Sequence, residues 1–230
     1  MKRSISMSSL EKVKVENLFD LEYTAAKPLL SQCEYPWEAL PKIGEFILSL
    51  GATLSGEEYL HPENDLWIAK SAKIFPTAVI LGPAIIGPKT EVRPSAFIRG
   101  NALVGKNCVI GNSSELKNVI IFDDVQVPHF NYVGDSILGH FAHMGAGSIL
   151  SNIKQDRKNV VLHVEGESIQ TGLRKIGAMI GDSVEIGCNS VLNPGVIIGR
   201  RSNIYPLSMV RGYVPQDSIY KKQGEVAEKE

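Results

Sequence analysis

The chain has 230 residues, enough for one sizeable hydrophobic core and a small additional unit. Its hydrophobic content of 43% and charged content of 21% are ordinary for a globular protein. A formal net charge of −1 gives no overall attraction to nucleic acid or to an anionic membrane, so we expect neither as a partner. An anionic ligand would have to be held by a local group of basic residues.

The three cysteines, Cys33, Cys108 and Cys188, are odd in number and far apart. This pattern favours reduced thiols in a cytoplasmic protein over a disulfide framework. No closely spaced pair of cysteines or histidines has zinc-site spacing, so no metal is expected. Met1 to Leu10 lacks the apolar stretch of a leader, and no segment is apolar over the length of a membrane span.

Residues 1–60 carry helical signals and are predicted to form an N-terminal cap. Ser8 and Glu11 have capping-box spacing, which predicts the start of a first helix. A second helical stretch follows Pro36, with Gly51 as its expected C-cap. Because a β-helix leaves its first coil open, we expect these helices to cover that end.

An aliphatic residue then returns every six positions. The first run is strict: Ile68, Ile74, Ile80, Ile86, Val92, Ile98, Val104, Ile110 and Leu116. The spacing shortens by one residue before Ile121 and again before Leu138, and a last strict run extends from Ile180 to Val210. Neither a helical nor a two-residue strand period explains this pattern.

A hexad repeat predicts short strands joined by turns, with three hexads closing one triangular coil of a parallel β-helix. The aliphatic residue points into the prism, and a small residue two positions earlier, such as Ala84 or Ala102, fits at the corner. Successive coils should stack about 4.8 Å apart, the usual strand spacing. We therefore assign residues 61–220 to an all-β domain of this kind.

Residues 151–179 interrupt the hexads. Apolar and polar residues alternate from Val160 to Val164, and Gly166 favours a turn, which together predict an extended arm or hairpin leaving the prism. Long insertions in compact folds are more often functional than accidental. The charged residues 221–230 are expected to form a frayed tail.

Several motifs within the hexads carry a family resemblance. They are Val92-Arg93-Pro94, Gly111-Asn112-Ser113-Ser114-Glu115-Leu116-Lys117, His129-Phe130-Asn131-Tyr132-Val133-Gly134-Asp135, Gly145-Ala146-Gly147-Ser148-Ile149 with Asn152, and Thr171-Gly172-Leu173-Arg174-Lys175. With them, residues 91–214 resemble the acetyltransferase domain of glucosamine-1-phosphate N-acetyltransferase/N-acetylglucosamine-1-phosphate uridylyltransferase, and are most similar to its archaeal-type relatives. The family's nucleotidyltransferase domain is not matched, so uridylyl transfer is not expected.

This resemblance implies a left-handed β-helix that transfers an acetyl group from acetyl-CoA to an amino-sugar 1-phosphate, with glucosamine 1-phosphate as the first candidate. Such an activity belongs to nucleotide-sugar and cell-envelope biosynthesis. The resemblance also implies a homotrimer with its active sites between subunits. Transfer would be direct, without a covalent enzyme intermediate.

The resemblance assigns catalytic roles to His129 and Asn152. An ammonium must lose its proton before it can attack a thioester, and histidine is suited to accept that proton near neutral pH. Asn152 would either orient the amine or polarise the acetyl carbonyl. Outside its motif, a histidine that follows Pro128 would more often be structural.

Five further residues match substrate-binding positions: Arg93, Lys117, Tyr132, His143 and Lys158. Arginine and lysine would hold the sugar phosphate, and Lys158 would reach it from a neighbouring subunit. His143 stands where many relatives have asparagine, so its contact with the sugar is open. Arg174 and Lys175 could reach phosphate too, or lie on the surface.

Ala146 and Cys188 match positions that line the acetyl-CoA groove, where backbone N–H groups contact the pantetheine arm. Arg211 is a candidate for the CoA phosphates, as are Arg200 and Arg201. Cys188 as a nucleophile is the weaker interpretation, because no histidine or acidic partner lies near it in sequence.

Two other classes of protein stay open. A γ-type carbonic anhydrase also has hexad prisms, and His129, His140 and His143 could be compared with its zinc ligands, although their spacing differs from the expected one. A non-catalytic trimeric scaffold would keep the prism without turnover. The retention of several catalytic-motif residues argues against this scaffold.

Overall fold

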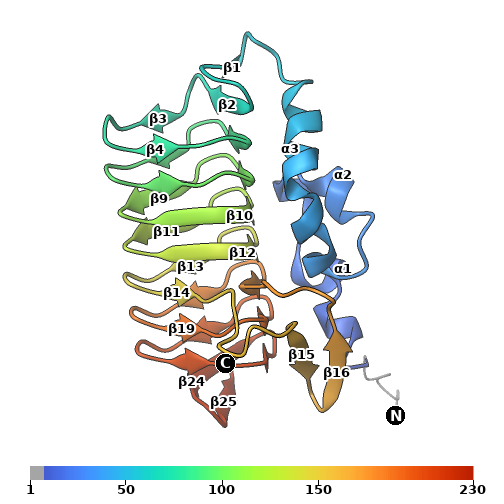
Figure 1. Cartoon of the computed structure of the whole chain (residues 1–230). Helices are drawn as coiled ribbons and strands as arrows, with labels where there is room; N and C mark the ends of the chain where they lie inside the picture. The colour runs from blue at the N-terminus through green and yellow to red at the C-terminus, as the bar shows by residue number, and fades with distance from the viewer. Residues whose placement is uncertain (1–7, 230) are drawn as a thin grey trace, which may run out of the picture.

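The computed structural model describes residues 8–229 (Figure 1). The expected absence of a leader falls mainly on residues 1–7, outside the described part. Parallel strands stack in coils to form an elongated β-helix, which confirms the predicted fold class. No helix in the described part of the chain is long and apolar enough to cross a membrane.

Each coil contributes strands to three faces. Face 1 contains β3 (Lys73–Ile74), β6 (Glu91–Val92), β9 (Val109–Asn112), β11 (Gln126–His129), β13 (His143–Met144), β18 (Glu185–Ile186), β21 (Asn203–Ile204) and β24 (Ser218–Lys222). Face 2 contains β4 (Val79–Ile80), β7 (Phe97–Ile98), the first halves of β10 (Glu115–Ile121) and β12 (Tyr132–Leu138), β14 (Ile149–Leu150), β19 (Val191–Leu192) and β22 (Met209–Val210). Face 3 contains β2 (Leu66–Ala69), β5 (Ala84–Ile86), β8 (Ala102–Val104), the second halves of β10 and β12, β17 (Ala178–Ile180), β20 (Val196–Ile198) and β23 (Tyr213–Val214).

The aliphatic hexad residues form the core of the prism. Those from Ile86 to Val210 are buried, whereas Ile68, Ile74 and Ile80, at the N-terminal end, are only partly covered. Within the described residues, no coil precedes the first one on faces 1 and 2, which leaves these side chains partly open. The hexad pattern therefore identified the inward-facing side chains correctly.

The two shortened repeats lie on adjacent coils. They allow β10 and β12 to run without a break from face 2 to face 3, whereas elsewhere the chain turns between separate strands. Lys117 pairs with Gly134 across this corner. The next residues, Asn118 and Asp135, both have a left-handed backbone, with φ of 55° and 48°. The shortened corner is thus a local feature of these two coils.

The N-terminal segment, residues 8–58, lies along face 3, where Figure 1 shows it as blue helices beside the prism. It contains η1 (Glu11–Val13), α1 (Val15–Leu18), η2 (Leu21–Tyr23), α2 (Lys27–Leu30), η3 (Pro36–Lys42) and α3 (Ile43–Gly51). We call it the strap. The prediction that it covers the open first coil is wrong, because α3 packs on β5, β8 and β10, and η3 packs on β12.

The outward side chains of face 3 explain this position. Ile85, Leu103, Ile120, Ile137 and Met179 point away from the prism axis and yet are buried. Burying such a row removes several hundred Å² of apolar surface from water, at about 25 cal/mol per Å². The six-residue repeat identifies only the inward side chains, so it did not show that the outward side chains of face 3 are apolar as well.

The helices of the strap are shorter than predicted. Ser8 Oγ accepts from the Glu11 N–H at 3.4 Å, but the first helix breaks into single turns. Gly51 is the last residue of α3 and not a left-handed C-cap. It is small because a Cβ there would lie 2.5 Å from the ring of Trp67.

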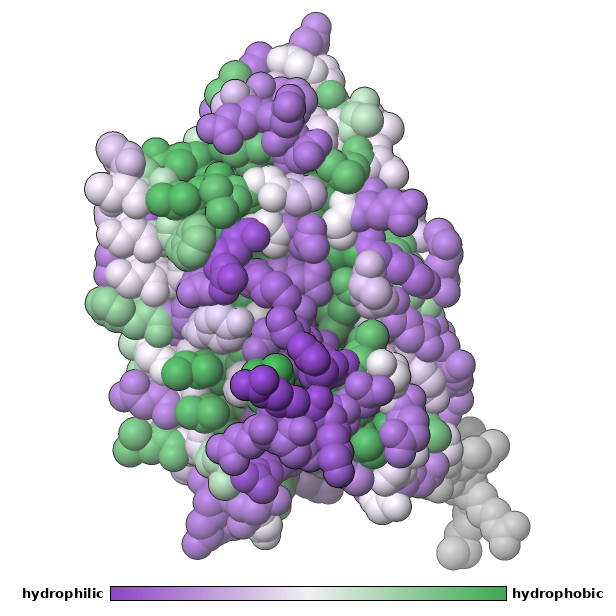
Figure 2. All heavy atoms as spheres, in the orientation of Figure 1, coloured by the Kyte–Doolittle hydropathy of each residue, from purple (hydrophilic) through white to green (hydrophobic). Residues whose placement is uncertain are grey.

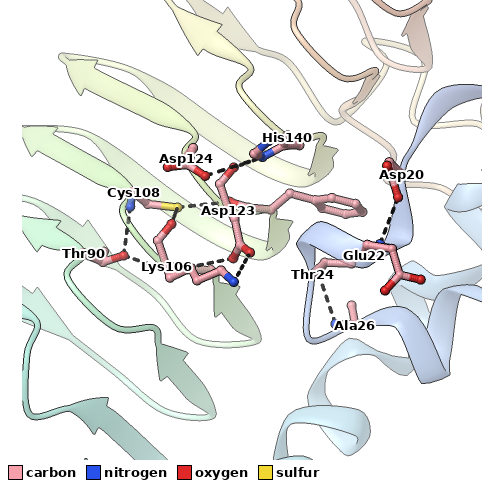
Figure 3. Close-up of polar contacts among 12 residues, drawn as sticks. Asp20, Glu22, Thr24, Ala26, Thr90, Lys106, Cys108, Asp123, Asp124 and His140 are labelled. Atoms are coloured by element: carbon pink, nitrogen blue, oxygen red, sulfur yellow. Dashed lines mark hydrogen bonds and ion pairs between the residues drawn. The ribbon is translucent and has the colours of Figure 1, made fainter.

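The strap is fixed at the corner between faces 3 and 1, where Figure 3 shows its residues Asp20 to Ala26 beside Asp123 and His140 of the prism. The ring of Tyr23 stacks on that of His140, with centroids 3.7 Å apart. The backbone N–H of Asp20 donates to Asp182 Oδ2 at 2.8 Å, and the Asp123 N–H donates to the Tyr23 carbonyl. These contacts hold the strap against successive coils.

One antiparallel strand extends a single face at each end of the stack. At the N-terminal end, β1 (Tyr59–Leu60) pairs with β2. At the C-terminal end, β25 (Glu225–Glu228) pairs with β24. The predicted frayed tail is therefore wrong up to Lys229, whose ammonium donates to the Arg201 carbonyl; Glu230 is outside the described residues.

The insertion forms the predicted hairpin, β15 (Val161–Val164) with β16 (Glu167–Gln170). Its turn at Glu165 and Gly166 has φ of 46° and 90°. The hairpin does not extend away from the chain, however, because Leu162 is buried against Gly195 of the prism. Glu165 also pairs with Lys12 of the strap at 2.7 Å.

Candidate functional site

His129, Ala146 and Cys188 lie in one column along the corner between faces 1 and 2. The N–H of Gly147 donates to the His129 carbonyl, and that of Asn189 donates to the Ala146 carbonyl. Each residue thus occupies the same position on a successive coil, about 4.8 Å from the next. The His129 side chain is exposed on the outside of the prism.

Backbone donors are available along this column. Within residues 8–229, the N–H groups of Ala146 and Cys188 have no hydrogen-bond acceptor. Because these residues sit in turns between strands, the sheet ladder does not use their amides. Two unpaired donors on adjacent coils suit a ligand that carries carbonyl groups along its length.

A second group of polar side chains gathers at the shortened corner between faces 2 and 3. Lys117 Nζ lies 3.0 and 3.2 Å from the two carboxylate oxygens of Asp135. Asn118 Nδ2 donates to Asp135 Oδ1 at 2.9 Å. Asn152 Nδ2 donates to Asp135 Oδ2 at 2.5 Å and to the Tyr132 hydroxyl at 3.2 Å. We call Lys117, Asn118, Tyr132, Asp135 and Asn152 the corner cluster.

Burial, and then the charges of Asp135 and Glu115, raise the pKa of the Tyr132 phenol above its ordinary value. The phenol is therefore a neutral hydroxyl near pH 7. Because it already accepts from Asn152, its own proton is free to donate. Glu115, on the same face, is paired with Arg99 at 2.7 Å.

The other predicted substrate residues do not join the corner cluster in one chain. Arg93 lies at the His129 corner, two coils toward the N-terminus, where its Nε donates to Glu91 at 3.0 Å. His143 projects from face 1 and its Nδ1 lies 2.7 Å from Glu185. Lys158 is exposed in the insertion.

The basic residues considered for phosphate binding are also separated. Arg211 is exposed at the corner between faces 2 and 3, not beside Ala146 and Cys188. Arg200 pairs with Asp182 and Arg201 pairs with Asp217. Arg174 and Lys175 are exposed in the insertion.

The three histidines compared with zinc ligands lie in different places. His140 is at the strap corner, with its Nδ1 3.0 Å from the Asp123 carbonyl, whereas His129 and His143 occupy another corner and face 1. Among the described residues, no group of three His, Cys, Asp or Glu side chains could hold a metal ion. The absence of a metal remains a prediction.

Sequence reasoning missed Asp135 and Asn118 as site residues. Asp135 ends the recognised His129 motif, so the motif itself was the available signal. Asn118 is indicated only by the shortened repeat, whose corner needs residues that accept a positive φ.

Outward side chains on face 2 are largely apolar and exposed. They include Val79, Phe97, Ile149, Val191 and Met209, with Glu115 and Tyr132 between them. Figure 2 shows green patches over the upper and lower coils of the prism, separated by a purple band. A row of this kind on an otherwise polar surface is typical of a contact with another protein surface.

Comparison with known proteins matches most of the chain. Residues 80–173 match the family described as the GMPPB C-terminal domain, and residues 177–212 match the bacterial transferase hexapeptide repeats. The bifunctional protein GlmU of Methanococcus maripaludis is 37% identical over 191 residues, which is 82% of this chain and 46% of that protein. The β-helix is a GlmU-like hexapeptide-repeat domain.

Another relative of this GlmU-like chain is the bifunctional sugar-1-phosphate nucleotidylyltransferase/acetyltransferase of Sulfurisphaera tokodaii. It is 39% identical over 112 residues, 49% of this chain and 28% of that protein. The chain thus spans less than half the length of these curated relatives. Among solved structures, the acetyltransferase domain of PglB from Neisseria gonorrhoeae in complex with acetyl coenzyme A has a TM-score of 0.35 and 18% identity, with 67% of this chain and 53% of that chain covered.

Proposed function

We propose that this chain transfers an acetyl group from acetyl-CoA to the amine of an amino-sugar 1-phosphate, most simply glucosamine 1-phosphate. The observation that carries the proposal is the corner cluster, which draws Lys117, Tyr132 and Asn152 together from separate parts of the sequence. The names of the relatives, which include sugar-1-phosphate and acetyltransferase activities, support the same class of substrate.

The free hydrogen-bonding groups of the cluster complement such a substrate. Both amide hydrogens of Asn152 are used, so its Oδ1 is left as an acceptor for an amine N–H. This favours the role of orienting the amine over that of polarising the acetyl carbonyl, which needs a donor. Tyr132 and Lys117 offer an O–H and an N–H to hydroxyl or phosphate oxygens.

Acetyl-CoA would lie along the corner of His129, Ala146 and Cys188. The unpaired N–H groups of Ala146 and Cys188 suit the carbonyls of the pantetheine arm, and one of them could stabilise the developing oxyanion. His129 accepts the ammonium proton, the amine nitrogen attacks the thioester carbon, the C–S bond breaks, and CoA leaves as a thiolate that is then protonated.

A homotrimer completes this site. In one chain, among the described residues, no hydrogen bond joins the His129 ring to the corner cluster, which lies across face 2. The apolar exposed residues of face 2 support contact with a second copy. That contact would place the His129 corner of one subunit beside the corner cluster of the next.

Thiol release tests the proposal. The chain is incubated with acetyl-CoA and a panel of amino-sugar 1-phosphates, their nucleotide-linked forms and neutral amino sugars. We expect turnover with a 1-phosphate and a mass corresponding to three chains by light scattering. No thiol release with any amine would contradict the proposed activity and favour the scaffold, whereas a strict monomer would contradict the shared site.

A further inference from the structure

Asp135 is a nearly buried carboxylate to which the proposed mechanism assigns no step. Only 6% of its side chain is exposed. An ionised carboxylate in such a place is costly unless each oxygen is paired. Its backbone is left-handed, with φ of 48°, at the second of the two shortened corners.

The surroundings of Asp135 fill its acceptor sites. Oδ1 accepts from Lys117 Nζ at 3.0 Å and from Asn118 Nδ2 at 2.9 Å. Oδ2 accepts from Lys117 Nζ at 3.2 Å and from Asn152 Nδ2 at 2.5 Å. A carboxylate offers about four lone-pair positions, so none is left for a substrate proton. Asp135 is therefore not available as a general base.

We propose that Asp135 is a positioning residue: it fixes which way the Asn152 amide faces and where the Lys117 ammonium lies. A carboxylate only accepts, so it requires Nδ2 of Asn152 on its own side and turns Oδ1 toward the ligand. The same carboxylate restrains Lys117, whose third proton remains for an anionic oxygen. This inference rests on the proposed function for its kinetic consequence, and on geometry alone for its structural one.

The strap is connected to the same carboxylate. Asn118 Nδ2, besides its bond to Asp135, donates to the Leu40 carbonyl of η3 at 3.3 Å. The second amide hydrogen of Asn118 therefore ties Asp135 to the segment that covers face 3. This hydrogen bond to the strap restrains the Asp135 side chain, although Asp135 lies in a short turn, so that it can orient Asn152 and Lys117.

Asp135→Asn tests the proposal, because it keeps the size of the side chain and removes acceptor capacity. One carboxylate oxygen is replaced by an NH2 group, which donates and cannot accept, so the variant can no longer hold both Asn152 and Lys117. Asp124→Asn is the matched control: Asp124 is also a left-handed corner aspartate, with φ of 61°, but it lies near His140 at another corner. Both variants are compared with the unsubstituted chain.

We expect Asp135→Asn to lower kcat by at least about 30-fold and to raise the KM for the sugar phosphate. The KM for acetyl-CoA and the thermal midpoint should stay near those of Asp124→Asn. If Asp135 only stabilised the fold, its replacement would instead lower the thermal midpoint. Activity within threefold of wild type would overturn the proposal. So would equal losses for both substrates with a lowered thermal midpoint.

Crystal structures of the two variants separate this inference from the proposed function. In Asp135→Asn we expect the Asn152 amide to turn or Lys117 Nζ to leave hydrogen-bond distance of residue 135, with neither change in Asp124→Asn. If the wild type releases no thiol, the proposed function fails while these structures still decide the positioning. Unchanged Asn152 and Lys117 would overturn it in either case.

Discussion

Lys117 and Asp135 form an ion pair in which the carboxylate is far more buried than the ammonium: 6% of the Asp135 side chain is exposed against 28% of Lys117. Lys117 therefore has two roles: it neutralises the buried Asp135 carboxylate, and it still presents an N–H donor to solvent or a ligand. Both roles can be separated by experiment.

We expect Lys117→Met to lower the free energy of unfolding by about 2 kcal/mol, because it leaves Asp135 with only its amide donors. Lys73→Met is the control, since its pair with Glu91 is long at 3.5 Å and exposed, and such pairs contribute under about 1 kcal/mol. Urea titration measures both. Equal, small effects would show that Asp135 does not depend on this lysine.

His129→Ala should lower kcat by on the order of 100-fold or more, because no base is left to accept the proton of the substrate ammonium. Binding of CoA should persist, since the column of backbone donors at Ala146 and Cys188 is untouched. His163→Ala serves as the control, because His163 is exposed in the insertion hairpin, where its Nδ1 lies 2.9 Å from Ser168 Oγ. Calorimetry with CoA and thiol release give the two readouts; near-normal turnover would refute the base assignment.

The thiols should differ in reactivity. Cys188 is exposed, whereas Cys33 and Cys108 are buried, and burial raises the pKa of the Cys108 thiol to about 12. At pH 8 we expect a disulfide reagent to modify one thiol in the native protein and all three after unfolding. Acetyl-CoA should slow the first reaction, and Cys188→Ser should remove it. Slow modification of Cys188 in the wild type without acetyl-CoA would mean that Cys188 does not line an open groove.

Gly51→Ala should destabilise the chain by about 1–3 kcal/mol, because its Cβ would lie 2.5 Å from Trp67 ring atoms and force the strap and prism apart. Gly56→Ala is the matched control, since a Cβ there meets nothing within 4 Å. Thermal unfolding of the two variants gives the comparison. Equal midpoints would mean that α3 does not pack on β2 in solution.

Stability should fall in alkali. Burial raises the pKa of Tyr213 to about 12, whereas an unfolded tyrosine titrates near pH 10. Between these values the folded chain holds more protons than the unfolded one, so the free energy of unfolding decreases as pH rises from about 10 to about 12. Tyr213→Phe should flatten this decrease and Tyr205→Phe, at an exposed position, should not. Identical pH profiles for the two variants would contradict this assignment.

The hexads predicted the fold because each aliphatic residue repeats one geometric position, as the burial of Val92, Ile110 and Leu192 confirms. The hexads could not predict which face the strap covers. Ile85 and Leu103 on face 3 and Phe97 on face 2 are all large apolar residues directly before an inward residue, so the sequence pattern does not distinguish the covered face from the exposed one. The motifs brought Lys117, Tyr132 and Asn152 into one list, and the structure brings them into one cluster. The role of Asp135 depends on counting its acceptors, which requires coordinates.

The antiparallel strands β1 and β25 have a consequence for the solution behaviour of the molecule. A stack of parallel coils ends in rows of free amide and carbonyl groups, to which another molecule could add without limit. Here one of the three faces at each end carries a strand that runs the wrong way to template a further coil: β1 on face 3 at the N-terminal end and β25 on face 1 at the C-terminal end. A further coil could therefore not continue all three faces in register, which disfavours fibre growth along the prism axis.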